Sequence, residues 1–144
     1  MKILSTTDTK NQIYLDAVEI RYKVFVEEQQ VSPEIELDEN EALCVHFVLY
    51  NEENRAVATA RILPNKNGIA TLQRMAVLKE YRKNGYGRDV IVAVEEFARK
   101  QQFYEIILHA QLTAKDFYEK MGYLPFGAEF DEAGIKHVSM KKEI

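Results

Sequence analysis

A helix-like apolar pattern enclosed by two strand-like runs restricts the fold of this chain more than any other feature. The apolar residues fall at the spacing of one face of an amphipathic helix that begins near Arg88. They are Val90, Ile91, Val94, Phe97 and Ala98. Residues 69–77 before this helix and residues 106–108 after it have the composition of strands. A strand, a crossover helix and a return strand in one sheet make the two strands parallel.

An antiparallel meander is predicted ahead of this unit. Residues 44–50 and residues 56–63 are strand-like and are separated by a polar tetrapeptide. Asn67 and Gly68 form a turn signal that leads from the second run into residues 69–77. We therefore expect three consecutive antiparallel strands.

The remaining segments supply helices and a closing hairpin. Apolar spacing predicts an early helix over residues 11–28, and the acidic residues 31–41 are expected to form a solvated connecting loop. Thr113 with Asp116 three positions later resembles a capping box that opens a short helix, and Gly122 suits the end of that helix.

Two further strands are predicted at residues 127–130 and 137–141, on either side of a turn at residues 131–134. With 144 residues, of which 47% are hydrophobic, the chain can bury one sizeable core but hardly a second. We therefore expect one domain over residues 1–144, of the α/β class. Its sheet is expected to be mixed and mostly antiparallel, with a central parallel pair and flanking helices.

Composition excludes several classes of function. No stretch approaches the roughly 20 apolar residues that span a bilayer, and the first residues lack a secretory signal, which predicts a soluble, cytoplasmic protein without a membrane partner. A net charge of −4 argues against nucleic-acid binding. Cys44 is the only cysteine, so an intrachain disulfide cannot form, and a buried inert thiol is favoured over a nucleophile. No metal site is expected.

A run of glycines and basic side chains lies between the strand of residues 69–77 and the amphipathic helix. Glycines at this place let backbone N–H groups turn toward a ligand, and the start of the helix adds free donors and its dipole. The basic side chains supply charge-assisted hydrogen bonds that an acidic protein otherwise lacks. The predicted pyrophosphate-binding residues are Arg82, Lys83, Asn84, Gly85, Tyr86, Gly87 and Arg88.

The glycine pair alone would also fit a plain tight turn. A nucleotide P-loop requires lysine and a hydroxyl residue after its last glycine, whereas Arg88 and Asp89 follow Gly87. A dinucleotide fingerprint requires a third glycine where Val90 stands. Neither familiar phosphate loop matches.

Two linked motifs resemble the GNAT acetyltransferase superfamily. Residues 72–77 followed by residues 81–87 resemble its central motif, R/Q-x-x-G-x-G/A. Residues 114–123 are similar to its A-x-x-F-Y-x-K-x-G-F/Y segment, at the expected spacing. The resemblance implies acetyl-CoA as cofactor and a sheet whose parallel strand pair splays apart.

The two ends of the chain resemble one small bacterial branch of that superfamily. The similar segments are residues 21–29 and residues 134–140, so the resemblance covers nearly the whole chain. The branch often carries proline where Lys136 stands, a departure that could alter the local turn.

The resemblance also assigns roles around the thioester. It gives Met75, Ala76 and Val77 the contacts with the pantetheine arm, on a bulged strand. An oxyanion at the thioester carbonyl also requires a backbone donor, and an N–H of this segment is the candidate. Tyr118 matches a tyrosine that protonates the leaving thiolate in the superfamily. Without the motif, Tyr118 would be interpreted as a tyrosine that packs on a helix face. Gln111 stands where relatives often place an asparagine near the cofactor.

The base that removes a proton from the amine is harder to assign. Many relatives have glutamate where Gln73 stands, and an uncharged amide cannot act as a base. His109 lies two residues before Gln111 on the same face of its strand and is a candidate base, with a structural histidine as the alternative. Glu28 and His137, in the terminal segments, are further candidates for this base or for substrate binding, with structural hydrogen bonds as the alternative.

The leading hypothesis is transfer of an acetyl group from acetyl-CoA to a primary amine of a small molecule or peptide, by direct attack in a ternary complex. A non-catalytic acyl-CoA sensor or scaffold is the alternative, because the carboxylate at Gln73 is missing. A general nucleotide-phosphate module is a weaker possibility. The acidic residues 34–41 could attract a cationic amine, or they are merely solvated. A homodimer is compatible with the sequence.

Overall fold

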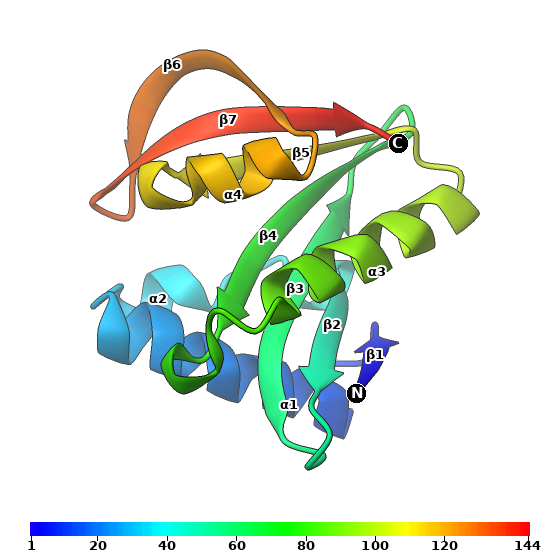
Figure 1. Ribbon diagram of the computed structural model, residues 1–144, viewed down its shortest axis with the longest axis vertical. Coiled ribbons are helices and arrows are strands. Elements are labelled where there is room, and N and C mark those ends of the chain that lie inside the picture. Colours follow the sequence, from blue (N-terminus) through cyan, green and yellow to red (C-terminus); the bar gives the residue numbers. More distant parts are fainter.

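The computed structural model describes residues 1–144 and contains one mixed sheet of seven strands in the order β1-β2-β3-β4-β5-β7-β6 (Figure 1). The strands are β1 (Lys2–Thr6), β2 (Val45–Tyr50), β3 (Ala56–Pro64), β4 (Ile69–Val77), β5 (Glu105–Gln111), β6 (Leu124–Glu132) and β7 (Ile135–Glu143). The helices are α1 (Gln12–Arg21), α2 (Pro33–Glu36), α3 (Tyr86–Lys100) and α4 (Lys115–Lys120). Only β4 and β5 pair in parallel, which confirms the predicted mixed fold.

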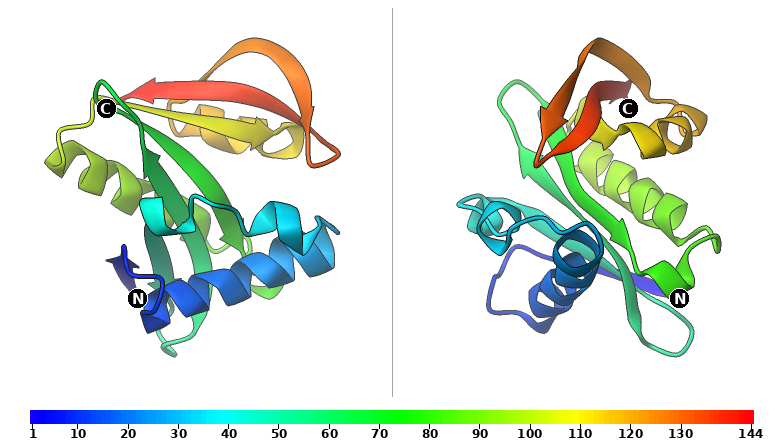
Figure 2. Two further views of the ribbon diagram at one scale, coloured as in Figure 1. Left: turned by 180° about the vertical axis from the view of Figure 1, so that it is seen from behind. Right: turned by 90° about the vertical axis from the view of Figure 1, so that its left-hand side faces the viewer.

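Helices cover both faces of the sheet (Figure 2). On one face α3 buries the apolar side chains that the sequence predicted, among them Val90, Ile91 and Val94, against β2, β3 and β4. On the other face Ala17 and Ile20 of α1 pack with a second buried cluster that includes residues of β2 and β4. The early helix spans nearly the predicted residues, since α1 continues directly into a π-helical turn, Tyr22–Glu28.

The acidic segment before β2 differs from its prediction. It was expected to be a solvated loop, but it contains α2, and Glu36 is buried with 3% of its surface exposed. The Arg21 guanidinium lies 2.6 Å from Glu36 and 2.8 Å from Glu41, and Arg61 lies 2.8 Å from Asp38. Burial of these carboxylates is possible because distant arginines neutralise them. They are therefore not free to attract a cationic amine.

The start of α4 also differs from its prediction. A 3-10 turn, Leu112–Ala114, precedes α4, so Thr113 lies inside helical geometry and no side chain caps the helix. The predicted capping box is wrong for this reason. Gly122 does end the helix, with φ +96°, and the Tyr123 N–H donates to the Tyr118 carbonyl at 3.1 Å.

The closing hairpin is longer than predicted, and an additional strand lies at the N-terminus. Ala133 and Gly134 both have positive φ, 52° and 77°, which is the geometry of a tight two-residue turn between β6 and β7. Strand β1, which the sequence analysis did not predict, pairs with β2 at the sheet edge.

A bulge in β4 shapes the centre of the sheet. Two steps along β3, from Thr59 to Arg61, face three steps along β4, from Gln73 to Ala76, so β4 carries one extra residue. Arg74 lies in the bulge with φ +55°. The parallel pairing of β4 with β5 stops at Leu72, and beyond it the strands separate (Figure 1). This is the splayed pair that the resemblance implied.

Candidate active site

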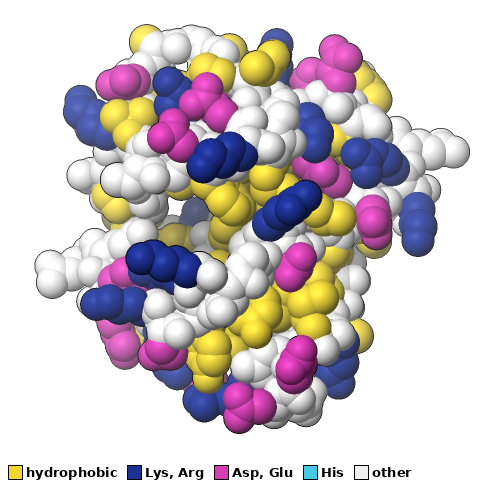
Figure 3. Space-filling model, viewed as in Figure 1, with side chains coloured by type: hydrophobic (Ala, Val, Ile, Leu, Met, Phe, Trp, Pro, Cys, Tyr) yellow, Lys and Arg dark blue, Asp and Glu magenta, His cyan; other side chains and the backbone are white.

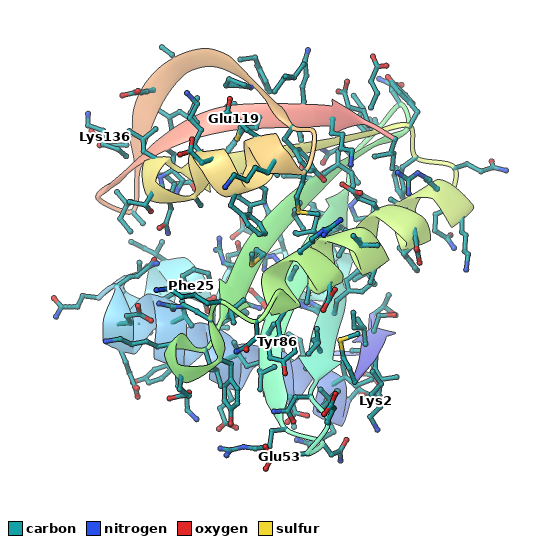
Figure 4. All side chains as sticks on the ribbon, in the orientation of Figure 1. Lys2, Phe25, Glu53, Tyr86, Glu119 and Lys136 are labelled. Carbon is teal, nitrogen blue, oxygen red and sulfur yellow. The ribbon has the colours of Figure 1, made fainter.

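A cavity of about 1000 Å³ opens where β4 and β5 separate. Tyr86 at the start of α3 and Phe25 on the π-helical turn mark two of its sides (Figure 4). The surface is hollowed here and apolar side chains lie at the edge of the hollow (Figure 3). All predicted site residues line the cavity except Asn84 and Glu28; those that do are Met75, Ala76, Val77, Arg82, Lys83, Gly85, Tyr86, Gly87, Arg88, His109, Gln111, Tyr118 and His137.

Two glycines give the loop before α3 its shape. Gly85 is the N-cap of α3 and has φ +79°, a left-handed conformation that glycine adopts without steric cost. A Cβ atom on Gly87 would lie 3.0 Å from the Met75 Cε, so the glycine lets the helix start pack closely on β4. The first N–H groups of α3 have no partner within the helix, and their residues line the cavity. This end of the cavity can therefore bind an anion.

The basic side chains of the loop have different surroundings. The Arg82 guanidinium is held by both carboxylate oxygens of Glu28, at 2.7 Å each, and its Nε donates to the Val77 carbonyl at 3.0 Å. This hydrogen bond from Arg82 lowers the pKa of Glu28. Glu28 thus holds Arg82 against the loop, whereas Lys83 and Arg88 form no ion pair.

The Asn84 side chain binds the backbone of its own loop. Its amide donates to the Tyr81 carbonyl at 2.9 Å and to the Arg82 carbonyl at 3.3 Å. The side chain is therefore occupied by the backbone of the loop, while the backbone of its glycine neighbours faces the cavity.

Tyr118 lines the cavity from the side of α4. Its ring contacts Phe117 and Tyr123 edge to face, and only 7% of the residue is exposed. Burial raises the pKa of Tyr118, and its hydroxyl makes no hydrogen bond to protein atoms. A protonated, unoccupied hydroxyl at the cavity can donate a proton or a hydrogen bond to a ligand.

His109 and Gln111 lie on the face of β5 that points away from α3. Neighbouring residues Leu108 and Ala110 point into the core beneath α3, so the His109 and Gln111 side chains lie on the other face of the sheet, where α1 packs against β2, β3 and β4. The Gln111 Nε2 donates to the Gln29 Oε1 at 2.9 Å, and the reverse donation measures 3.4 Å. This amide pair connects β5 to the end of the π-helical turn.

Glu132 is a site residue that the sequence analysis missed. The His109 Nδ1 lies 3.0 Å from the Glu132 Oε1, and the His137 Nε2 lies 3.7 Å from its Oε2. His137 itself is buried, and its Nδ1 lies 2.7 Å from the Ile135 carbonyl. The available signal was the tight turn at Ala133, which places Glu132 beside Ile135 near the predicted His137.

Gln73 faces the arginines that bind the carboxylates of the acidic segment. The Arg61 Nε and Nη2 donate to the Gln73 Oε1 at 3.0 and 2.8 Å. Arg61 is 1% exposed and also binds Asp38 and Glu41 at 2.8 and 2.7 Å. Gln73 therefore acts as a neutral acceptor for a guanidinium that two carboxylates already balance.

Other functional groups are limited. No group of three or more His, Cys, Asp or Glu side chains is placed to hold a metal ion. None of the helices combines the length and apolar character needed to cross a membrane. Cys44 is fully buried, and burial raises the pKa of its thiol, as expected of an inert cysteine.

The bulged β4, its separation from the parallel strand β5 and the glycine-rich start of α3 are the features that the sequence resemblance to acetyltransferases implied. The profile of the acetyltransferase (GNAT) domain matches residues 8–144. The chain therefore belongs to the GNAT acetyltransferase family.

Relatives in sequence and structure agree with this assignment. The chain is 42% identical over 134 residues to the uncharacterized protein YyaT of Bacillus subtilis, covering 90% of this chain and 88% of YyaT. It is 40% identical to the uncharacterized N-acetyltransferase YjcF of the same organism, covering 93% and 96%. A crystal structure of a protein from Lactobacillus plantarum, proposed to be an N-acetyltransferase, superposes with a TM-score of 0.90 at 33% identity, covering 99% of this chain and 97% of that one.

Proposed function

We propose that this protein transfers the acetyl group of acetyl-CoA to a primary amine of a small molecule or peptide, by direct attack within a ternary complex. One observation carries the proposal: Tyr118 and His109 line the same cavity from opposite faces of the splayed sheet. The leaving thiolate can thus meet Tyr118 and the incoming amine can meet His109 at the same carbonyl carbon.

The chain's own groups fit the acyl donor. The free N–H groups at the start of α3, with Lys83 and Arg88, suit a pyrophosphate. The β4 backbone at Met75, Ala76 and Val77 has no β5 partner. Apart from the Val77 carbonyl, which accepts from Arg82, its groups on that side can pair with an amide-bearing arm. Acetyl-CoA supplies an activated thioester, and one β4 N–H is a suitable donor to the charge that develops on its oxygen.

The protons of the reaction balance through two side chains. The acceptor ammonium gives one proton to His109, directly or through water, so that its nitrogen can attack the carbonyl carbon. The C–N bond forms and the C–S bond breaks, and Tyr118 gives its hydroxyl proton to the departing sulfur. The new amide nitrogen loses a second proton, which restores Tyr118 through water, and His109 releases the first proton to solvent.

Acetyl-CoA turnover across an amine panel tests this function. We expect Tyr118→Phe to lower kcat about a hundredfold, because general acid catalysis typically contributes 10²–10⁴-fold, with little change in the Kd for CoA. Tyr104→Phe, at a tyrosine 54% exposed outside the cavity, is the matched control and should keep wild-type rates. Equal rates for Tyr118→Phe and wild type on an active substrate would remove Tyr118 from the mechanism.

The second candidate is a non-catalytic acyl-CoA sensor or scaffold. The neutral Gln73 beside Arg61 favours it, because the site lacks a carboxylate base at this place. The sensor predicts tight acetyl-CoA binding without thiol release on any amine or peptide, and robust turnover would dismiss it. Thermal stabilisation by ATP but not by CoA would contradict both candidates.

A further inference from the structure

Glu132 joins two histidines into one cluster at the cavity. The cluster combines His109 of β5, Glu132 of β6 and His137 of β7, and all three residues line the cavity. No lysine or arginine pairs with Glu132, in contrast to Glu36, Asp38 and Glu41 of the acidic segment. The two imidazole rings are the only basic groups within 4.0 Å of its carboxylate oxygens.

The geometry fixes the tautomer of His109. An ionised carboxylate can only accept hydrogen bonds, so the His109 Nδ1 at 3.0 Å from the Glu132 Oε1 must carry a proton. In the neutral ring the Nε2 is then an unprotonated acceptor. This Nε2 makes no hydrogen bond within the protein, and 46% of the His109 side chain is exposed. A ligand in the cavity can reach it.

His137 does not compete for the Glu132 carboxylate. The Ile135 carbonyl, 2.7 Å from the His137 Nδ1, can only accept, so the Nδ1 proton of His137 is committed there. A neutral His137 then has no N–H for Glu132. Phe130 packs against both imidazoles, with ring centroids 5.1 Å from His109 and 5.9 Å from His137, and restricts how either ring can turn.

We propose that Glu132 is a positioning residue for acetyl transfer, an inference that rests on the proposed function. Glu132 holds His109 in the Nδ1–H tautomer, so that the Nε2 receives the proton of the acceptor ammonium. The negative charge of Glu132 then stabilises the imidazolium, as an orienting carboxylate does in other acid–base pairs. The Nδ1 proton stays in place throughout, and the imidazolium releases its Nε2 proton to solvent.

A double-mutant cycle tests this dependence. We expect His109→Ala to lower kcat about a hundredfold and Glu132→Ala about tenfold or more, with the KM for acetyl-CoA unchanged. The double variant should be no slower than His109→Ala, because Glu132 acts through His109. Losses that multiply would overturn the positioning role and assign Glu132 to the acceptor itself. Glu132→Gln keeps an acceptor oxygen without the charge and should lose less than Glu132→Ala.

Nitrogen NMR of the histidine rings reports the tautomer without any turnover. In wild type we expect His109 as the Nδ1–H tautomer, and in Glu132→Ala we expect the Nε2–H form to appear. Glu129→Gln changes an exposed carboxylate of the same strand that forms no ion pair, so it should keep both the tautomer and the rate. An Nδ1–H tautomer that persists in Glu132→Ala would refute the inference.

The two readouts separate the possible failures. If wild type acetylates no amine, the proposed function fails while the NMR experiment still decides whether Glu132 orients His109. If wild type is active and His109→Ala keeps its rate, acetyl transfer stands and the role of Glu132 is overturned.

Discussion

Substitution of Gly85 by valine separates the backbone strain in the loop before α3 from the contribution to CoA binding that we propose for this loop. Gly85 has φ +79°, and no neighbouring atom lies within 4 Å of the position that a Cβ atom would take. The backbone conformation rather than a clash therefore opposes the substitution. A side chain in this region costs about 1–2 kcal/mol, and more when it is β-branched. We therefore expect Gly85→Val to leave the left-handed conformation and to tilt the first N–H groups of α3.

The expected loss of affinity follows from those N–H groups. A hydrogen bond to a charged group contributes about 1.5–3 kcal/mol, so losing one weakens binding of CoA by roughly 10-fold to 150-fold. Isothermal titration with CoA measures this change, and urea unfolding measures stability. Gly127→Val is the matched control, because Gly127 has φ +76°, no atom within 4 Å and no contact with the cavity.

We expect both valine variants to lose similar stability and only Gly85→Val to lose CoA affinity. A wild-type Kd for CoA in Gly85→Val, together with the same loss of stability as in Gly127→Val, would refute the reasoning and place the phosphates elsewhere.

Three further predictions concern buried groups. Arg61→Met should lower the free energy of unfolding in urea by about 3–5 kcal/mol, because breaking a buried ion pair leaves an uncompensated charge. Arg55→Met breaks no ion pair and should change the free energy of unfolding little. Burial alone would raise the pKa of Glu41, but hydrogen bonds and charge from Arg21 lower it below its usual range. Stability from this group is present above the unfolded-state pKa of about 4.3 and is lost as pH falls below it, so Glu41→Gln should show a shallower acid dependence in thermal melts. A thiol reagent should label Cys44 only on unfolding, and fast labelling of the native protein would contradict its burial.

Local patterns in the sequence predicted much of the framework. The apolar face of α3 and the meander of β2, β3 and β4 were predicted because spacing and turn residues are encoded within a few positions. The capping box at Thr113 failed because a preceding 3-10 turn, which no local rule required, changed its backbone geometry. β1 was not predicted, because its stability comes from pairing with β2 rather than from its own pattern.

The sequence by itself determined the glycine-rich loop that we propose as the cofactor site, since the glycines and basic residues around Gly85 are contiguous and their backbone requirements are local. Tertiary structure alone decided which charged and polar groups meet. Gln29 pairs with Gln111 across 82 positions, and Glu132 reaches His109 across 23 positions. Such pairs depend on strand register and on how α1, β5 and the closing hairpin pack, which no short segment specifies. The carboxylates of Glu36, Asp38 and Glu41 are held inside the protein for the same reason, because Arg21 from α1 and Arg61 from β3 neutralise them there.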